Sequence, residues 1–162
     1  MVLDVSAIFN TPGMTLPFAF DLPQGEPYDT LPFARPAHVV GQARNRVGIV
    51  ELTGTVQVCL HALCARCAVS FNYETAVPLE HTLVNTRESE DSDELIFITS
   101  DRFLLDELVW EDIVLFLPSR FLCKPDCQGL CPRCGQNRNE SVCNCKPKAD
   151  PRLAALRSLL PE

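Results

Sequence analysis

The sequence predicts an α+β fold, and three observations carry that prediction. Apolar and polar residues alternate along residues 50–60 and again along 69–79, as they do in half-buried strands. A longer apolar run at helical spacing occupies residues 103–117, and six cysteines crowd residues 120–146. We therefore expect an antiparallel β-sheet able to curl towards a barrel, one long helix, and a C-terminal cysteine-rich zinc-binding segment ending in a short helix.

Length and composition favour one globular domain with a small appendage. The chain has 162 residues, of which 46% are apolar and 22% charged. It contains no run of the roughly 20 apolar residues that a membrane span needs, and its first residues lack the pattern of a secretory signal. We expect a cytoplasmic protein, in which nine cysteines point to metal ligation or redox chemistry instead of disulfides.

The charge is distributed unevenly along the chain. Residues 1–119 hold 6 Lys/Arg and 17 Asp/Glu, a net charge of −11, whereas residues 120–162 hold 8 Lys/Arg and 4 Asp/Glu, a net charge of +4. The sequence thus predicts an acidic α+β body, residues 1–119, and a basic cysteine-rich zinc tail, residues 120–162, packed on it. The body suits a basic protein partner, and any contact with nucleic acid should come from the tail.

The strands of the sheet are predicted from local patterns. Six of the 13 prolines lie in residues 1–36, where only short or edge strands fit, such as residues 16–22. The two alternating segments are close enough in sequence to form an antiparallel hairpin with Cys64 and Cys67 at its tip. Residues 88–94 carry five carboxylates in seven positions and indicate a solvated loop.

Two helices are expected. The first spans residues 103–117, with Asp101 as its N-cap and Pro118 near its end. Two apolar stripes indicate a helix covered on two sides; they are Leu105, Val109, Ile113 and Phe116 in one, and Leu104, Leu108 and Leu115 in the other. The second helix begins at Asp150 and Pro151 and presents the stripe Leu153, Leu156 and Leu160. We expect that stripe to dock on the body, with a partner as the alternative.

Cysteine spacing predicts metal binding in the tail. The run has almost no aliphatic residues to form a core, and a tetrahedral zinc–thiolate site supplies folding free energy where burial does not. In residues 131–135 the pattern CPRCG is a zinc-knuckle turn whose glycine permits a positive φ. We predict two four-cysteine sites: Cys64, Cys67, Cys123 and Cys127 for one ion, and Cys131, Cys134, Cys143 and Cys145 for the other.

Other assignments stay open at this point. A single zinc ion, a mixed set of ligands, or iron in place of zinc is compatible with the spacing. His61 is a substitute ligand, and Cys59 is predicted to be a packed thiol. Basic residues beside the sulfurs offset the negative charge of four thiolates; these are Arg66, Lys124 and Arg133.

The sequence does not predict an enzyme. It has no GxSxG, P-loop, GxGxxG or HExxH motif, and four sulfur ligands leave no open position for a catalytic water. The CxxC at residues 64–67 leads into a strand, whereas a thioredoxin-type pair needs a helix there. The remaining titratable residues are interpreted as ordinary surface or core histidines and solvated helix carboxylates, namely His38, His61 and His81, and Asp106, Glu107, Glu111 and Asp112.

The order of these motifs resembles the YceD-like family, whose members are known as large ribosomal RNA subunit accumulation proteins. The match is carried first by the CxRC turn at residues 64–67 and an EDIxLxLP helix end at 111–118. It continues with the pattern Cx3CxGLCPxCGxNxN at residues 123–139, the CxC at 143–145 and DPRL at 150–153. The resemblance implies a bacterial or plastid factor in large-subunit biogenesis. The absence of a transit-peptide pattern favours bacterial cytoplasm.

Two functional hypotheses follow. The resemblance implies a non-catalytic factor that supports accumulation of large-subunit (23S) ribosomal RNA by binding ribosomal protein, the 23S precursor, or both, with no membrane or small-molecule substrate. Its tail contacts would be Arg133, Arg138, Lys146, Lys148, Arg152 and Arg157, although ordinary solubility also explains these charges. The alternative is a thiol-redox or metal-responsive regulatory protein using Cys64 and Cys67. A DNA-binding zinc module is less favoured because no basic recognition helix is evident.

Overall fold

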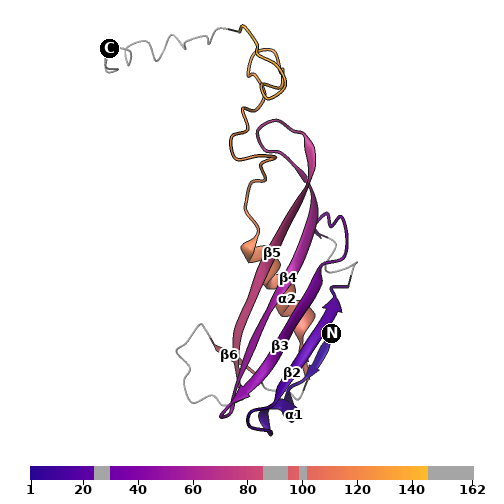
Figure 1. Cartoon of the computed structure of the whole chain (residues 1–162), viewed down its shortest axis with the longest axis vertical. Coiled ribbons are helices and arrows are strands. Elements are labelled where there is room, and N and C mark those ends of the chain that lie inside the picture. Colours follow the sequence, from indigo (N-terminus) through magenta and orange to yellow (C-terminus); the bar gives the residue numbers. More distant parts are fainter. Residues whose placement is uncertain (24–29, 86–94, 99–101, 146–162) are drawn as a thin grey trace, which may run out of the picture.

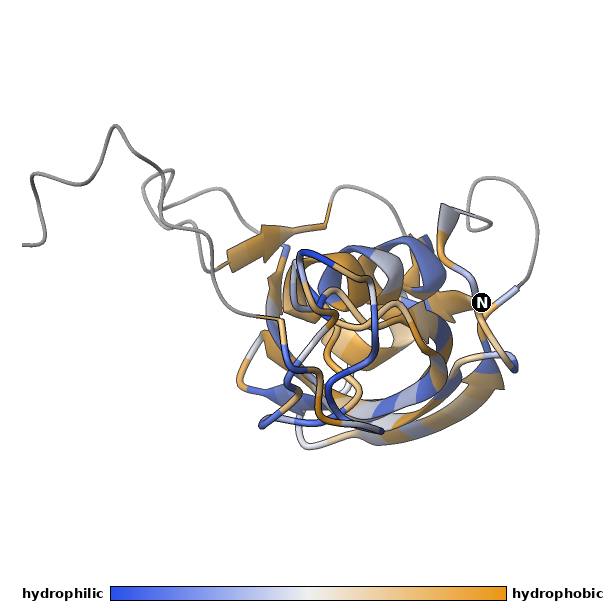
Figure 2. Ribbon diagram, turned by 90° about the horizontal axis from the view of Figure 1, so that it is seen from above, coloured by the Kyte–Doolittle hydropathy of each residue, from blue (hydrophilic) through white to orange (hydrophobic). Residues whose placement is uncertain are grey.

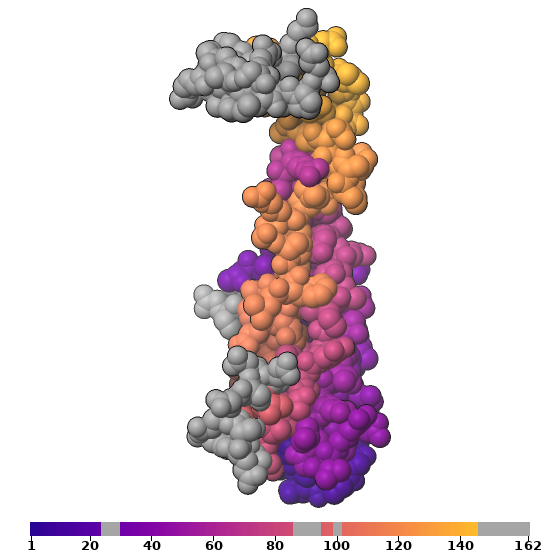
Figure 3. All heavy atoms as spheres, turned by 90° about the vertical axis from the view of Figure 1, so that its left-hand side faces the viewer, coloured from indigo at the N-terminus to yellow at the C-terminus, as the bar shows by residue number. Residues whose placement is uncertain are grey.

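The protein forms an elongated rod in the computed structural model, which describes residues 1–23, 30–85, 95–98 and 102–145 (Figure 1). Most strands and both helices lie at one end, and the cysteine-rich segment lies at the other (Figures 1 and 3). The elements in chain order are β1 (Val2–Asp4), α1 (Val5–Phe9), β2 (Thr15–Asp21), β3 (His38–Arg46), β4 (Ile49–Leu63), β5 (Ser70–Val84), β6 (Leu95–Phe97), β7 (Arg102–Leu104) and α2 (Leu105–Phe116).

The main sheet is mixed and open. Its order is β2-β3-β4-β5-β6, with antiparallel pairing except between β5 and β6, which are parallel. A second sheet pairs β1 with β7. The expectation of an α+β protein with a largely antiparallel sheet is confirmed, whereas closure towards a barrel is wrong. The sheet curves around the helices as a trough, and β2 and β6 remain its edges (Figure 2).

A long hairpin gives the molecule its length. Strands β4 and β5 pair without interruption from Ile49 opposite Val84 to Leu63 opposite Ser70. Fifteen residues in each strand correspond to about 50 Å of extended chain. The third strand stops opposite Gln57, so the last part of the hairpin projects beyond the main sheet. The predicted hairpin is confirmed, and both of its strands are longer than the alternating patterns indicated.

Two glycines allow neighbouring groups to approach closely within the main sheet. Gly41 of β3 lies opposite Gly54 of β4. A Cβ on Gly41 would lie 2.5 Å from the Thr53 carbonyl oxygen and 2.6 Å from the Phe18 ring, and one on Gly54 would lie 2.6 Å from the Val40 carbonyl oxygen. The backbones and the Phe18 ring occupy that space, so a side chain at either position would push the strands apart.

The core lies between the curved sheet and one face of α2. The alternating positions of β4 are buried as predicted, and from α2 the buried side chains are Leu105, Leu108, Val109 and Ile113. The prediction of a helix covered on two sides is wrong, because Leu115 is 85% exposed and Leu104 and Phe116 are about half exposed. The sheet curls around one side of the helix only (Figure 2).

The start of α2 differs from the prediction. Its N-cap is Leu104, without a side-chain capping bond, because the residues before the helix pair with β1 as strand β7. The predicted cap, Asp101, lies outside the described residues. The interpretation of four helix carboxylates as solvated holds for Glu107 and Glu111, which are exposed, and is wrong for the other two. Asp106 is 2.7 Å from the Met1 amino group, and Asp112 is 2.7 Å from His81 Nε2.

Strand β3 was not predicted, because Val39 is the one large apolar residue among its inward positions, and the others are small or polar. Among them is Asn45, which is 1% exposed. Its Nδ2 donates to the carbonyl oxygens of Ile8 (2.7 Å) and Phe9 (3.0 Å), and its Oδ1 accepts from Gly48 N at 3.0 Å. One buried amide therefore joins the end of α1 to the turn between β3 and β4.

Several predicted features lie outside the described residues, namely the acidic loop at 88–94 and the terminal helix from residue 150. Within the described part of the chain, no helix is long and apolar enough to cross a membrane.

We predict that Asn45→Ala lowers the free energy of unfolding by about 2–3 kcal/mol, because two carbonyl groups and one amide lose their buried partner. Denaturant unfolding measures the change. Asn72→Ala is the matched control: Asn72 is exposed and bonds only His61 Nδ1 among the described contacts, at 2.9 Å, so its change should stay below about 0.5 kcal/mol. Equal effects of the two substitutions would contradict this account of the fold.

Candidate metal centre

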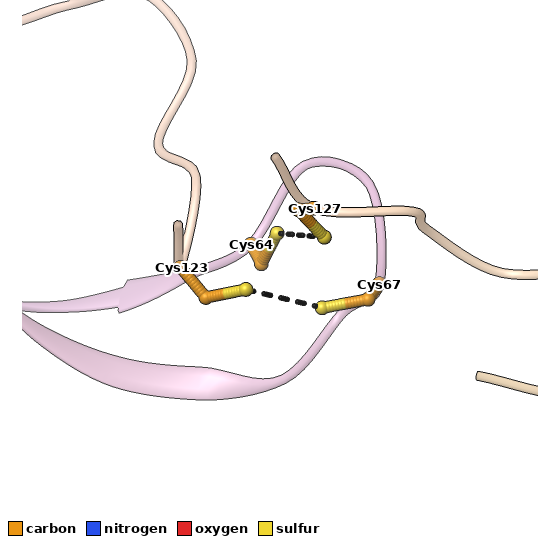
Figure 4. A group of neighbouring side chains, drawn as sticks. All are labelled: Cys64, Cys67, Cys123 and Cys127. Carbon is orange, nitrogen blue, oxygen red and sulfur yellow. Dashed lines mark hydrogen bonds between the residues drawn. The ribbon is translucent and has the colours of Figure 1, made fainter. Parts of the chain in front are cut away.

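The tip of the long hairpin presents two cysteines. Cys64 and Cys67 lie in the connection between β4 and β5, and both are buried although the tip projects from the sheet. The turn is closed by Cys64 N donating to the Val69 carbonyl oxygen (3.0 Å) and Ala68 N donating to the Cys64 carbonyl oxygen (2.9 Å). This leaves the two side chains on the same side of the turn (Figure 4).

The tail returns to this tip after α2 ends. Phe121 packs edge-on against Tyr73 of β5, with ring centroids 4.9 Å apart, and its carbonyl oxygen accepts from Ala65 N at 2.8 Å. Further along, Leu130 N donates to the Arg66 carbonyl oxygen at 3.0 Å. The described part of the tail therefore lies against the projecting hairpin (Figures 1 and 3).

Four sulfurs meet where the tail crosses the tip, and we name them the hairpin tetrad: Cys64, Cys67, Cys123 and Cys127. All four Sγ atoms lie within 4.8 Å of one another, with 3.7 Å from Cys64 to Cys127 and 3.6 Å from Cys67 to Cys123 (Figure 4). Three of the four residues are buried, and together with the half-buried Phe71 and Leu122 they form a second core, separate from that of the body.

A second group, the tail tetrad, lies at the far end of the rod. Its members are Cys131, Cys134, Cys143 and Cys145, with all Sγ atoms again within 4.8 Å of one another. It is more open than the hairpin tetrad, because Cys134 and Cys145 are exposed and only Cys131 is buried. The structure thus brings the eight cysteines together in the two groups that the sequence predicted.

The two CxxC turns share one backbone design. In the tail, Gly135 N donates to the Cys131 carbonyl oxygen at 2.9 Å and Cys131 N donates to the Gln136 carbonyl oxygen at 2.8 Å, which repeats the bonds at the hairpin tip. The residue after the second cysteine has a positive φ in both, 72° at Gly135 and 57° at Ala68. Alanine occupies this conformation at a cost that glycine does not carry. The sequence indicated the knuckle conformation of the second turn by its glycine, whereas the first was predicted as a ligand pair without that signal.

Backbone N–H groups in and near these turns lower the pKa values of two of the sulfurs. The backbone N–H of Cys123, with those of Cys67 and Arg66, lowers the pKa of Cys64 to about 6. The N–H groups of Cys134 and Arg133 lower the pKa of Cys131 to about 6. Burial raises the pKa of Cys123 to about 12, and hydrogen bonding with Cys134 raises the pKa of Cys145 to about 12. Each tetrad therefore favours ionisation of the sulfurs that accept from backbone N–H groups, and opposes it at others through burial and hydrogen bonding with neighbouring cysteines.

The donor set fits a tetrahedral thiolate-bound cation. With metal–sulfur bonds of about 2.3 Å, such a tetrahedron has sulfur–sulfur edges of about 3.8 Å, close to the 3.6 Å and 3.7 Å of the hairpin tetrad. A divalent ion would also remove the mutual repulsion that keeps four neighbouring thiols from ionising together. Zinc and iron both accept four thiolates, so the geometry defines the class of site and leaves the metal's identity to measurement.

The other residues considered from sequence lie as follows. Cys59 is buried in β4, apart from both tetrads, and His61 bonds Asn72 instead of a sulfur group. Arg66 Nη1 donates to the Cys127 carbonyl oxygen at 2.9 Å, beside the hairpin tetrad. Arg133 and Arg138 are exposed and line a surface hollow next to the tail tetrad. The remaining tail residues predicted to bind RNA or a partner, Lys146, Lys148, Arg152 and Arg157, lie outside the described residues.

One residue of the site was not assigned a role from sequence. Asn139 Nδ2 donates to Cys127 Sγ at 3.4 Å, and its Oδ1 accepts from Gln128 N at 2.8 Å. Asn139 follows the tail knuckle, yet it reaches a sulfur of the hairpin tetrad. The sequence gives the amide but no sign of which cysteine it contacts.

Comparison with known proteins places the chain in a family. Residues 52–160 match the family described as "Large ribosomal RNA subunit accumulation protein YceD". The match covers both CxxC turns and all eight clustered cysteines, and the chain belongs to this family.

Among curated proteins, the chain is 30% identical over 115 residues to uncharacterized proteins of Mycobacterium bovis and of two strains of Mycobacterium tuberculosis. The alignment covers 68% of this chain and 56% of each relative, so the chain spans little more than half the length of those proteins. No solved structure matches the chain.

We predict that Cys64→Ser lowers the metal content of the purified protein by about one ion per chain, because a hydroxyl is a poor substitute for a thiolate ligand. Elemental analysis measures the loss. Cys59→Ser is the matched control, since Cys59 lies in β4, just before the turn that holds Cys64, and is equally buried but belongs to neither tetrad. Its metal content should remain that of the wild type. Loss of metal from Cys59→Ser, or none from Cys64→Ser, would refute the assignment.

The two knuckles also predict opposite outcomes for exchanged residues. Ala68→Gly relieves a positive φ, and Gly135→Ala introduces the same strain where a Cβ meets no atom within 4 Å. Each change should alter the free energy of metal binding at its own site by up to about 1 kcal/mol, which is about fivefold in affinity. Competition with a chelator should show tighter binding for Ala68→Gly and weaker binding for Gly135→Ala. A shift of the same sign in both variants would contradict this geometry.

Proposed function

We propose that this chain is a non-catalytic factor in biogenesis of the large ribosomal subunit, which supports accumulation of 23S ribosomal RNA by binding ribosomal protein, the 23S precursor, or both. Membership of the YceD family is the observation that carries the proposal. The family description names the process, and the two sulfur tetrads suggest how the chain builds a binding end without catalytic chemistry.

In this proposal two structural zinc ions hold the distal end of the rod together. The hairpin tetrad would fix the tail to the hairpin, and the tail tetrad would fold the segment beyond it. Four sulfur ligands at each site favour a structural ion, because a catalytic ion needs a position open to water or substrate. The eight cysteines are therefore assigned as metal ligands, and none is assigned a catalytic role.

Charge favours RNA at the distal end and a basic protein at the body. Residues 1–119 have a net charge of −11 and residues 120–162 a net charge of +4. An acidic surface repels a phosphate backbone, whereas exposed arginines such as Arg133 and Arg138 bind one in a salt-dependent manner. A chain whose charges are separated in this way along its sequence is suited to join a basic ribosomal protein to ribosomal RNA.

The alternative, a thiol-redox or metal-responsive regulator, uses Cys64 and Cys67. The lowered pKa of Cys64 is typical of a reactive thiol. Against it, Cys67 leads into strand β5 and not into a helix, and two further sulfurs from the tail complete a tetrad around the pair. Thiol titration separates the two functions: metal-bound sulfurs stay unreactive until a chelator is added, whereas a redox pair reacts at once.

We predict that cells of the native host lacking this gene accumulate less large-subunit than small-subunit ribosomal RNA, and that the wild-type gene restores the ratio. A variant with the six basic tail residues neutralised should fail to restore it, because the salt-dependent RNA contact is lost. Those residues are Arg133, Arg138, Lys146, Lys148, Arg152 and Arg157. Quantification of both RNAs by electrophoresis gives the ratio.

The control in this experiment is Cys59→Ser, which alters a buried thiol outside both tetrads and should restore the ratio. Co-sedimentation with large-subunit precursors at low salt should follow the same ranking of variants. An unchanged RNA ratio in the deletion strain would refute the function. Restoration by the neutralised variant would refute the tail as the RNA contact.

A further inference from the structure

The two tetrads are separated by only a short piece of chain, and that piece is paired with the segment that follows the tail knuckle. Cys127 closes the hairpin tetrad and Cys131 begins the tail tetrad. Leu130 forms a β-bridge with Asn137, and Arg138 N donates to the Gly129 carbonyl oxygen at 2.9 Å. Residues 128–131 and 136–139 therefore form one small unit between the two sulfur groups.

Within this unit one side chain reaches a sulfur of the other tetrad. Asn139 lies in the chain between Cys134 and Cys143, so both ends of its segment are ligands of the tail tetrad. Its Nδ2 donates to Cys127 Sγ, at 3.4 Å, and to Asn137 Oδ1, at 2.8 Å. The backbone N–H of Gly129 also contacts the Cys127 sulfur, but Asn139 is the residue of the segment between Cys134 and Cys143 whose side chain does so.

We propose that Asn139 couples the two metal sites, so that an ion in the tail tetrad strengthens metal binding at the hairpin tetrad and the reverse. The proposal rests on the metal binding proposed above. An ion in the tail tetrad fixes both ends of the segment around residue 139 and removes its conformational freedom. The N–H group of Asn139 is then held against the Cys127 sulfur, which stabilises that thiolate as a ligand.

Linkage makes the effect reciprocal. If the tail ion tightens binding at the hairpin tetrad by some factor, the hairpin ion must tighten binding at the tail tetrad by the same factor.

The exposure of the sulfurs determines which ion a chelator removes first. The tail tetrad has two exposed cysteines and the hairpin tetrad has none, so a chelator reaches the tail ion first and then meets a weakened hairpin site. Asn139 is thus a positioning residue that acts through Cys127.

A double-mutant cycle tests the coupling. Wild type, Asn139→Ala, the tail-site variant Cys143→Ser with Cys145→Ser, and the combined variant are loaded with Zn²⁺ and challenged with a fixed concentration of chelator. Alkylation of Cys64 and Cys67, followed by mass spectrometry, reports release from the hairpin tetrad alone. Release should be about tenfold faster than wild type in the tail-site variant and also in Asn139→Ala. The combined variant should be no faster than either.

Two further variants test whether the effect is specific to the contact between Asn139 and Cys127. Gln136→Ala removes a bond of the same segment, from Gln136 Nε2 to Ser141 Oγ at 2.6 Å, and should leave release from the hairpin tetrad at the wild-type rate. Asn139→Asp keeps the acceptor for Gln128 N, removes the donor to the sulfur and to Asn137 Oδ1, and places a negative charge beside the thiolate. It should behave as Asn139→Ala does, and it replaces that variant if the alanine protein does not fold.

The outcomes distinguish a failure of the coupling from a failure of the metal binding on which it rests. If Cys64 and Cys67 of the wild type are alkylated at once without chelator, the chain holds no metal there and the proposed metal sites fail. If both tetrads hold metal but the effects of Asn139→Ala and of the tail-site variant multiply in the combined variant, the sites are independent and the coupling is refuted. An acceleration of release by Gln136→Ala comparable to that of Asn139→Ala would also refute it.

Discussion

The four-sulfur cluster at the tip of the β4–β5 hairpin is the contact on which the distal half of the molecule depends. Beyond Gln57 the hairpin leaves the main sheet, and beyond Phe116 the chain leaves the last described helix. Val58 and Leu60 still belong to the core of the body, and at the tip itself the buried cluster consists of Cys64, Cys67 and Cys127 with a few half-buried neighbours. A metal–thiolate bond supplies the folding free energy that so small an apolar cluster lacks.

The parts of the fold that follow strong periodic patterns were predictable from sequence. The hairpin, the edge strand β2 and the buried face of α2 each have a clear apolar pattern, and the structure confirms them. Strand β3 was not predicted from the sequence, because its inward residues include Gly41 and the buried Asn45, which forms hydrogen bonds with backbone groups. Barrel closure and the second covered face of α2 were wrong for one reason: local patterns show which residues are apolar, but not which faces find a partner.

The candidate site was more predictable than the fold, because sulfur spacing is a stronger signal than hydropathy. Eight cysteines in CxxC and similar pairs left few ways to form two groups of four, and the groups brought together are those expected. The second layer was not visible in sequence. The amino-acid sequence does not show that Asn139 contacts Cys127, because that contact depends on how the tail folds back. It also does not show that Ala68 adopts the positive φ of the knuckle glycine, because alanine rarely has that conformation.

The central claim is that bound metal holds the tail to the hairpin, and hydrogen exchange with and without a chelator tests it most directly. The account predicts two ions per chain, with amide protection across residues 120–145 that is lost on chelation while residues 38–58 stay protected. A purified chain without metal whose residues 120–145 nevertheless remain protected would contradict it.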